Sequence, residues 1–410
     1  MYKYILTMYQ VFDTMIVMNL SEIQNALTTL NLDAWLLYDF RGINPISQKV
    51  AGLSDAHITR RWFCLIPAQG EPHWLIHRIE TSNFTDVPGS VSLYAGWQEL
   101  NEEIQKLLSG VKSVAMEYSP DGSIPYISRV DAGTLEWVRS FGVEIKTSAE
   151  LAQYVEARLS KAQYEGHLKS AQQVLQAKDY AFAWIGDQLK SGRTITEYDV
   201  QQQILNQFDV NGLITDHPPI VAVNANSGNP HYAPSVSDSA PIKTDDFILI
   251  DLWAKQIEPD AVFADTTWVA YAGATVPDRY VEIFDIVKEA RDRAVAFIRE
   301  KWDANEPIPG YAVDDCVREY ITEKGYGNYF IHRTGHNIGT VIHGNGVNLD
   351  NLETRDERVL IEGICFSIEP GIYLNDFGVR TEIDVFLAGS GRDGVILTTS
   401  PVQTQVLPLL

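Results

Sequence analysis

Two acidic residues stand inside apolar segments that have the pattern of β-strands, and this constrains the fold more than any other feature. Asp251 is the one charge in FILIDLW, and Asp265 opens DTTWVAY. An ionised carboxylate in such a run is costly unless a cation meets it. If the two strands pair antiparallel, the carboxylates lie close together and a shared cation relieves their repulsion. Taken alone, Asp251 would be better explained as an N-cap or as a strand-end aspartate near a turn.

Two glutamates repeat this pattern further along the chain. Glu369 lies in SIEPGIY, where Pro370 holds it in an extended conformation. Glu382 lies in VRTEIDV, with Arg380 two residues earlier on the same face. Arg380 is alternatively half of an ordinary surface ion pair with Glu382 or Asp384. That alternative does not account for Glu369.

The segment HRTGHNIGTVIHG holds three of the nine histidines: His332, His336 and His343. Gly335 and Gly339 flank His336 and permit a close approach of the backbone. A lone histidine is more often a core or surface residue, but this grouping favours a functional role. The segment is not the helix of a zincin, because the chain has no H-E-x-x-H motif.

Four carboxylates and one imidazole together predict a site for two divalent cations. Carboxylate oxygens suit Mn and Mg, imidazole suits Zn, Co and Fe, and the mixture suits a two-metal hydrolase. Such a centre turns water into a nucleophile near neutral pH.

The composition limits the partners of the chain. Its formal charge is -22, from 54 acidic and 32 basic residues among 410, which would repel nucleic acid and anionic membranes. Three widely spaced cysteines favour a reducing cytoplasm over a disulfide framework. The first twenty residues lack the pattern of a signal peptide or a membrane span. We expect translation to begin at Met18.

Alternating strands and helices predict an α/β arrangement in the first part of the chain. Its helices are expected at 21–30, 102–108 and 134–140, and its strands at 34–38, 62–66, 73–76 and 113–118. Ser21 with Gln24 is the expected capping box of the first helix.

Beyond residue 160, long helical stripes alternate with strands. The helices are expected from 160, from Thr194 with Glu197 as its capping partner, and over 277–300. The strands are expected at 220–223, 247–253, 266–271, 365–373 and 380–387. The domain boundary is expected near 155–161.

From about residue 160 to 405, these motifs resemble the pita-bread metallopeptidase family, which includes methionine aminopeptidase, prolidase, aminopeptidase P and creatinase. The resemblance implies a C-terminal pita-bread catalytic domain over 158–410, with outer helices around a curved antiparallel sheet. It also implies a smaller creatinase-type α/β domain over 18–157. Asp251, Asp265 and Glu382 would hold one metal. Asp265, His336, Glu369 and Glu382 would hold the other, so that Asp265 and Glu382 bridge the two.

The resemblance implies further roles around these ligands. His231 matches a histidine that lines the site, and His343 one that contacts the substrate carbonyl. His332 and Tyr373 match residues of the proline-specific branch, and Arg380 is expected to bind substrate or support the ligands. His217 is expected to be an ordinary loop residue. With Glu369 as the base, the catalytic residues are Glu369, His231 and His343.

The implied activity is hydrolysis of the N-terminal Xaa-Pro bond of dipeptides or short peptides by a cytoplasmic homodimer with two metal ions. Mn is expected, and Co, Zn and Fe also suit the ligands. Two alternatives stay open: departures from the family pattern at Asn337 and the extra residues within 254–264 favour the first, whereas the intact ligands, His231 and His343 argue against the second. One is lyase or amidinohydrolase chemistry on a small metabolite, and the other is a non-catalytic binding protein of the same fold.

Overall fold

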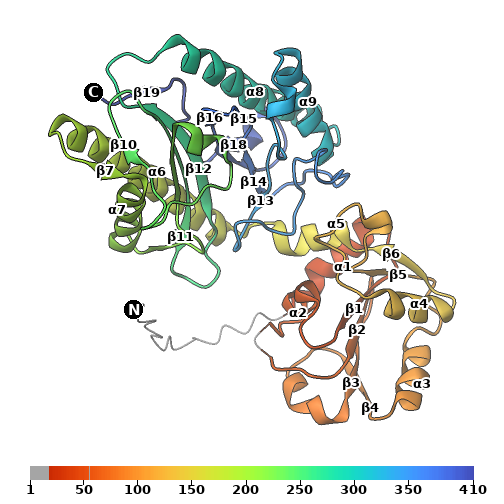
Figure 1. Ribbon diagram of the computed structural model, residues 1–410. Helices are drawn as coiled ribbons and strands as arrows, with labels where there is room; N and C mark the ends of the chain where they lie inside the picture. The colour runs from red at the N-terminus through yellow and green to blue at the C-terminus, as the bar shows by residue number, and fades with distance from the viewer. Residues whose placement is uncertain (1–17, 55) are drawn as a thin grey trace. The chain divides into compact units, whose positions relative to one another are not determined.

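The computed structural model describes residues 18–54 and 56–410 (Figure 1). The predicted start at Met18 concerns residues 1–17, which lie outside the described residues. The chain divides into two compact units, Met1–Leu151 and Ala152–Leu410, and each is described by itself. Across the described residues, no helix combines the length and the apolar character needed to cross a membrane.

The first unit is built on a six-stranded sheet in the order β4-β3-β2-β1-β5-β6. β2 is antiparallel to both of its neighbours, and the other neighbouring pairs are parallel. The strands are β1 (Ala34–Asp39), β2 (Trp62–Pro67), β3 (His73–His77), β4 (Ser90–Tyr94), β5 (Ser113–Met116) and β6 (Glu144–Thr147). The α/β arrangement predicted for this part of the chain is therefore present.

Helices lie on this sheet through apolar side chains. α3 contributes Leu100 and Ile104, and α4 contributes Leu135 and Val138, to one buried cluster with the sheet. Burial of these side chains supplies the main stabilisation of the unit. The helical segments are α1 (Leu20–Thr29), α2 (Pro45–Val50), η1 (Arg78–Phe84), α3 (Trp97–Leu107), η2 (Pro120–Gly122) and α4 (Ala132–Ser140).

The capping box predicted for the first helix is wrong. Asn19 is the N-cap of α1, and its side chain accepts a hydrogen bond from the Glu22 amide at 3.3 Å. The Ser21 hydroxyl donates to Asn19, and the Gln24 side chain donates to backbone carbonyls outside the helix. Asparagine is as good an N-cap as serine, and it stands two residues earlier.

The first half of the second unit packs two helices on one face of an antiparallel sheet. Ile248, Ile250 and Leu252 of β11 point toward α6 and α7, so the alternate residues of the strand face the other way. α5 (Ala149–Ala152) crosses the boundary between Leu151 and Ala152. The elements after it are η3 (Gln153–Ala157), α6 (Lys161–Lys190), β7 (Ile195–Thr196), α7 (Glu197–Val210), β8 (Leu213–Ile214), β9 (Ile220–Val223), η4 (Asn224–Gly228), β10 (Pro241–Ile242), β11 (Phe247–Gln256) and β12 (Ala264–Tyr271).

The cap predicted for α7 is also wrong. Thr196 and Asp199 form the capping box in place of Thr194 and Glu197. Glu197 is fully buried and accepts hydrogen bonds from the Val223 amide and other donors. Sequence spacing alone does not show which of two nearby threonines begins a helix.

The second half of this unit packs α8 and α9 around another group of strands. Figure 1 shows the two helices side by side, and both contribute to one core with β14 to β18. The elements are α8 (Asp278–Asp303), α9 (Gly310–Glu323), η5 (Gly327–Tyr329), β13 (Asn337–Ile338), β14 (Cys365–Ile368), β15 (Gly371–Tyr373), β16 (Gly378–Arg380), β17 (Ile383–Leu387), η6 (Arg392–Gly394), β18 (Val395–Leu397) and β19 (Leu407–Pro408). α9 was not predicted.

Two strands that were predicted as continuous are each broken in two. The segment 365–373 divides into β14 and β15 at Glu369-Pro370, and 380–387 resumes as β17 after Thr381-Glu382. Proline has no amide hydrogen to donate to a ladder, so pairing stops there. β14 pairs with β17, whereas β15 pairs with β16. Both glutamates of the predicted site therefore lie at the breaks.

Candidate metal centre

The antiparallel pairing predicted for the two aspartate-bearing strands is confirmed. β11 and β12 pair with Asp251 opposite Thr267 and Trp253 opposite Asp265. Asp251 and Asp265 are therefore diagonal neighbours on one face of the ladder. This is the face turned away from α6 and α7, because Ile250 and Leu252 occupy the other one.

Backbone hydrogen bonds hold Glu382 beside β12 and Glu369 beside the segment that precedes β13. The Glu382 amide donates to the Thr267 carbonyl at 3.1 Å, and the Glu369 amide donates to the Thr334 carbonyl at 2.8 Å. The strand breaks thus place each glutamate where its side chain can reach the aspartates.

Three of the five predicted ligands form a close cluster. Oxygen atoms of Asp265 and Glu382 and a ring nitrogen of His336 all lie within 4.8 Å of one another. His336 Nε2 lies 3.8 Å from Asp265 Oδ2 and 3.4 Å from Glu369 Oε1. The structure therefore brings four of the predicted residues together, and Asp251 lies beside them on the same face of β11 and β12.

The cluster lacks the donors that its carboxylates need. Asp265 and Glu382 are 5% and 2% exposed, and Asp265 Oδ1 and Glu382 Oε1 have no hydrogen-bond partner among the described residues. Burial, and then the neighbouring carboxylates, raise the pKa of both groups well above its ordinary value. Divalent cations satisfy such oxygens, so the residues present fit a metal site.

Arg380 is bound to Asp251. It is 4% exposed; Nη2 pairs with Asp251 Oδ2, and Nε donates to Thr267 Oγ1 at 2.9 Å. The alternative of a surface ion pair with Glu382 or Asp384 is therefore wrong. The guanidinium supplies the positive charge that this aspartate otherwise lacks.

A hydrogen-bonded chain extends from this arginine. Arg380 Nη1 donates to the Tyr373 hydroxyl at 3.0 Å, and that hydroxyl lies 2.7 Å from His332 Nε2. Burial, followed by the positive charge of Arg380, lowers the pKa of His332 to about 3, so its ring is neutral near pH 7. The three predicted residues form one network.

His343 and His231 lie on the solvent side of the cluster. Both are exposed, and the His343 ring stands edge-on to His336 with centroids 4.4 Å apart. Burial, followed by the charge of Arg333, lowers the pKa of His343 to about 4. Weaker effects of Asp216, His231 and His217 put these groups within electrostatic range of it. His217, expected to be an ordinary loop residue, therefore also lies near this side of the site.

Sequence reasoning missed three supporting residues. The Thr267 hydroxyl lies 2.7 Å from Glu382 Oε2 and 3.0 Å from Asp251 Oδ1. Asp384 Oδ2 accepts from the Asp265 amide at 2.9 Å, and His167 Nε2 lies 4.0 Å from the same oxygen. Thr267 could have been predicted, because it lies two residues from Asp265 in the same strand and therefore on the same face. His167 could not, because more than 200 residues separate it from Asp384.

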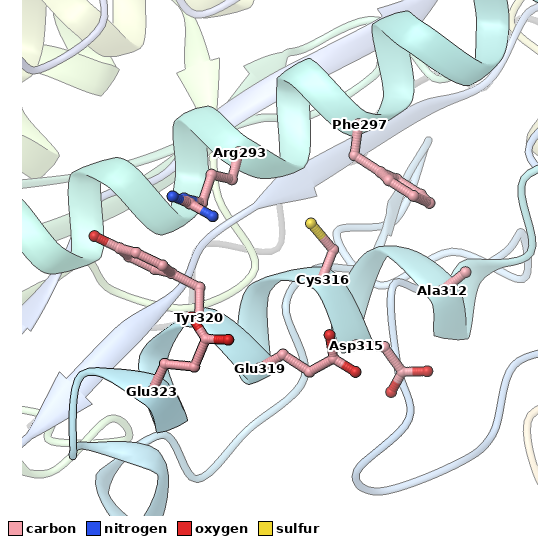
Figure 2. A pocket seen from close by; sticks show the side chains of 8 residues that line it. All are labelled: Arg293, Phe297, Ala312, Asp315, Cys316, Glu319, Tyr320 and Glu323. Carbon is pink, nitrogen blue, oxygen red and sulfur yellow. The ribbon is translucent and has the colours of Figure 1, made fainter.

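A cavity of about 400 Å³ lies elsewhere in this unit, between α8 and α9. Figure 2 shows Arg293 and Phe297 on α8 facing Cys316 and Tyr320 on α9. Burial raises the pKa of the Cys316 thiol. None of the predicted site residues lines this cavity, so it is separate from the cluster.

Known proteins resemble the chain in sequence and in fold. The Xaa-Pro dipeptidase of Lactobacillus delbrueckii subsp. lactis is 30% identical over 300 residues, which cover 72% of this chain and 74% of that protein. Dipeptidase PepE from Mycobacterium ulcerans superposes with a TM-score of 0.66 at 20% identity, covering 95% of this chain and 97% of that one.

A third similar structure is an X-prolyl aminopeptidase from Caenorhabditis elegans, described as a cytosolic enzyme with a di-nuclear active site. Its TM-score is 0.62 at 17% identity, and the match covers 94% of this chain and 62% of that one. These likenesses confirm the predicted fold class. Residues 165–388 match metallopeptidase family M24. The chain is therefore a member of metallopeptidase family M24.

Proposed function

We propose that the chain is a metal-dependent exopeptidase that hydrolyses Xaa-Pro dipeptides. The observation that carries this proposal is the buried cluster of Asp265, His336 and Glu382, with two carboxylate oxygens that lack donors. Membership of a metallopeptidase family supports the reaction class, and the names of the similar dipeptidases support the substrate.

The proposed ligands divide into two sets. Asp251, Asp265 and Glu382 would hold one divalent ion, and Asp265, His336, Glu369 and Glu382 would hold a second. Thr267 and Arg380 orient Asp251 and Glu382 through their hydrogen bonds. Bound divalent ions at such a site polarise a carbonyl group and lower the pKa of water.

The remaining residues move protons and position the peptide. Glu369 accepts the proton of the attacking water and passes it to the leaving prolyl nitrogen. Its carboxylate is oriented for this by the Ser367 hydroxyl, which donates to Oε1 at 3.2 Å. His343 donates a hydrogen bond to the scissile carbonyl oxygen as negative charge develops there.

Substrate binding falls to the exposed side of the cluster, and the arginine network supports the ligands. His231 is exposed near His343 and binds the peptide beside the scissile bond. The network of Arg380, Tyr373 and His332 keeps the Asp251 side of the site in one geometry.

Four finer assignments belong to the same proposal. Manganese is the working metal, the enzyme acts in the cytoplasm, and it works as a homodimer. The catalytic domain spans 158–410 and follows a creatinase-type domain over 18–157. Carboxylate-rich ligand sets suit manganese, and three free cysteines suit a reducing compartment.

The test is a substrate panel with the full-length protein loaded with Mn²⁺. The panel contains Xaa-Pro dipeptides, Xaa-Pro-Xaa tripeptides and proline-free dipeptides. We expect cleavage of the Xaa-Pro dipeptides alone. Cleavage of the tripeptides would instead indicate an aminopeptidase. Silence toward every peptide with a full metal complement would contradict the proposal and favour chemistry on a small non-peptide metabolite.

A further inference from the structure

The face of β11 that carries Asp251 continues past the metal centre. Successive side chains of a strand point to opposite faces, so Trp253 and Lys255 share the face of Asp251. Trp253 pairs directly with Asp265 of β12, and side chains that are directly opposed start about 5 Å apart. Trp253 is half-buried. An aromatic side chain that is partly open to solvent therefore starts beside the proposed ligands.

A carboxylate and an apolar cluster hold this indole in place. β8 pairs with β11 so that Ile214 lies opposite Lys255, and the chain beyond Ile214 brings Asp216 to Trp253. Asp216 Oδ1 accepts a hydrogen bond from Trp253 Nε1 at 2.7 Å. The indole also packs against the buried cluster that includes Ile342. The ring is thus fixed at its polar edge and along its apolar body.

Asp216 can accept further donors. Its side chain is 42% exposed, and Oδ2 lies 3.5 Å from the Nδ1 atom of the exposed His217. A carboxylate has about four positions for donors, so the bond to Trp253 leaves room for a substrate group. Asp216 also lies within electrostatic range of His343, the residue proposed to contact the scissile carbonyl. A negative charge therefore lies close to the place proposed for the scissile bond.

The nearest lysine is committed elsewhere. Lys255 Nζ donates to the Thr340 carbonyl at 2.6 Å and stands over the Phe263 ring at 5.0 Å. Among the described residues, it forms no ion pair with Asp216. Arg333 is the other cation that acts on His343. The charge preference of the enzyme therefore reports whether Asp216 or Arg333 faces the substrate side chain.

We propose that Trp253 and Asp216 form the subsite for the side chain of the N-terminal residue, and that this subsite selects a basic residue. The favoured substrates are then Arg-Pro and Lys-Pro. The cationic group pairs with Asp216 while it lies on the indole of Trp253. Arginine fits best, because its planar guanidinium both stacks on aromatic rings and meets a carboxylate with two donors. This inference rests on the proposed Xaa-Pro dipeptidase function.

Steady-state kinetics of the Mn²⁺-loaded full-length protein test this subsite with Arg-Pro, citrulline-Pro and Glu-Pro. Citrulline has nearly the shape of arginine but no charge. We expect kcat/KM for Arg-Pro to be about tenfold above that for citrulline-Pro, because a charge-assisted hydrogen bond is lost with citrulline. Glu-Pro should be the poorest of the three.

The variant Asp216→Asn removes the charge and keeps an oxygen that can accept from the indole of Trp253. It should bring the ratio of kcat/KM for Arg-Pro to that for citrulline-Pro close to one. Asp209→Asn is the matched control, since Asp209 is exposed near the end of α7, and it should keep the tenfold ratio.

The outcomes separate this inference from the function on which it rests. Equal kcat/KM for Arg-Pro and citrulline-Pro would overturn the subsite and leave the dipeptidase function standing. A preference for Glu-Pro would assign the substrate side chain to Arg333 and overturn it as well, as would an unchanged ratio in Asp216→Asn. Silence toward every Xaa-Pro dipeptide would overturn the dipeptidase function and this inference together.

A second variant keeps the test decisive if Asp216→Asn does not fold. Trp253→Leu keeps an apolar side chain against the buried cluster and removes the ring. Its ratio of kcat/KM for Arg-Pro to that for citrulline-Pro should fall by about threefold, because the contact between the cation and the ring is lost. An unchanged ratio in this variant would refute the role of Trp253.

Discussion

Each unit of the molecule buries carboxylates, but the two units treat them in opposite ways. In the first unit, Glu117 is fully buried and accepts four hydrogen bonds. The donors are Trp35 Nε1 at 2.6 Å, Asn44 Nδ2 at 2.7 Å, Ser47 Oγ at 2.8 Å and Ser148 Oγ at 3.1 Å. Burial raises the pKa of Glu117, and these donors oppose the rise.

In the second unit, Asp265 and Glu382 are also buried, yet each keeps an oxygen that has no donor in the part of the chain that the structure describes. Burial raises the pKa of both groups, and neighbouring carboxylates raise it further. A buried carboxylate with a complete set of donors is satisfied within the fold, whereas one without them is stabilised by a bound cation or by a proton. Asp384 Oδ1 also lacks a donor among the described residues, so it is the place beside His336 that marks Asp265 and Glu382 as the ligands.

The largest expected effect is the loss of catalytic activity when the carboxylate of Glu369 is removed. Glu369→Gln should lower turnover of an Xaa-Pro dipeptide by at least about 1,000-fold, because the variant cannot accept the proton of water. Steady-state kinetics of the Mn²⁺-loaded protein measure this. The control is Glu362→Gln, an exposed glutamate seven residues earlier, which should keep full activity. Near-normal turnover in Glu369→Gln would refute the assignment.

His167 is a buried base, and both of its ring nitrogens have hydrogen-bond partners, as the Glu117 oxygens do. Nδ1 lies 2.7 Å from the Phe263 carbonyl and Nε2 2.7 Å from the Thr398 hydroxyl. Burial lowers its pKa to about 4 from 6.5, so as pH falls the unfolded chain binds the proton first. Above pH 6.5, the neutral His167 contributes about 3 kcal/mol to the free energy of unfolding. This contribution is lost as the pH falls from about 6.5 to about 4.

Chemical unfolding of the wild type and His167→Gln across this pH range isolates that contribution. The wild type should lose more stability on acidification than the variant does. Equal losses in the two proteins would show that His167 is not held in its neutral form.

Matched substitutions should change stability in opposite directions in the two units. In chelated protein, Glu117→Gln places an amide against donors and should destabilise the first unit by about 2 kcal/mol. Glu382→Gln removes a repelling charge and should stabilise the second unit by about 1 kcal/mol. Scanning calorimetry of each variant measures both changes. Destabilisation of the same size by both substitutions would show that Glu117 and Glu382 do not differ in this way.

The smallest expected effect concerns the support of a ligand. Asp384 Oδ2 accepts from the Asp265 amide at 2.9 Å, and asparagine can keep that bond while losing the charge. Asp384→Asn should therefore weaken Mn²⁺ binding by about tenfold. The exposed Asp393→Asn is the control. Unchanged affinity in Asp384→Asn would limit this residue to a packing role.

The sequence predicted those parts of the site that depend on local pattern. Alternation along 247–253 and 265–271 was enough to pair Asp251 with Asp265 on one face. The partner of Arg380 was beyond reach, because Asp251 lies 129 residues away and two nearer acids were available. Glu117 was missed for the same reason, since its donors are gathered from three separate segments.

Errors in the fold arose where local signals compete. Asn19 and Ser21 are both good N-caps, and the structure uses the first. α9 was missed although Val313, Val317, Tyr320 and Ile321 recur at helical spacing and are buried. Its N-cap is Pro309, and no side chain makes a capping bond there, so the usual signal for the start of a helix was absent.

The most direct test of the central claim is calorimetric titration of the chelated full-length protein with Mn²⁺, beside Glu382→Gln. If the unsatisfied oxygens of Asp265 and Glu382 mark a two-metal site, the wild type should bind two ions per chain. The variant should bind fewer, and more weakly. No binding by the wild type, or the same two ions in the variant, would contradict the account.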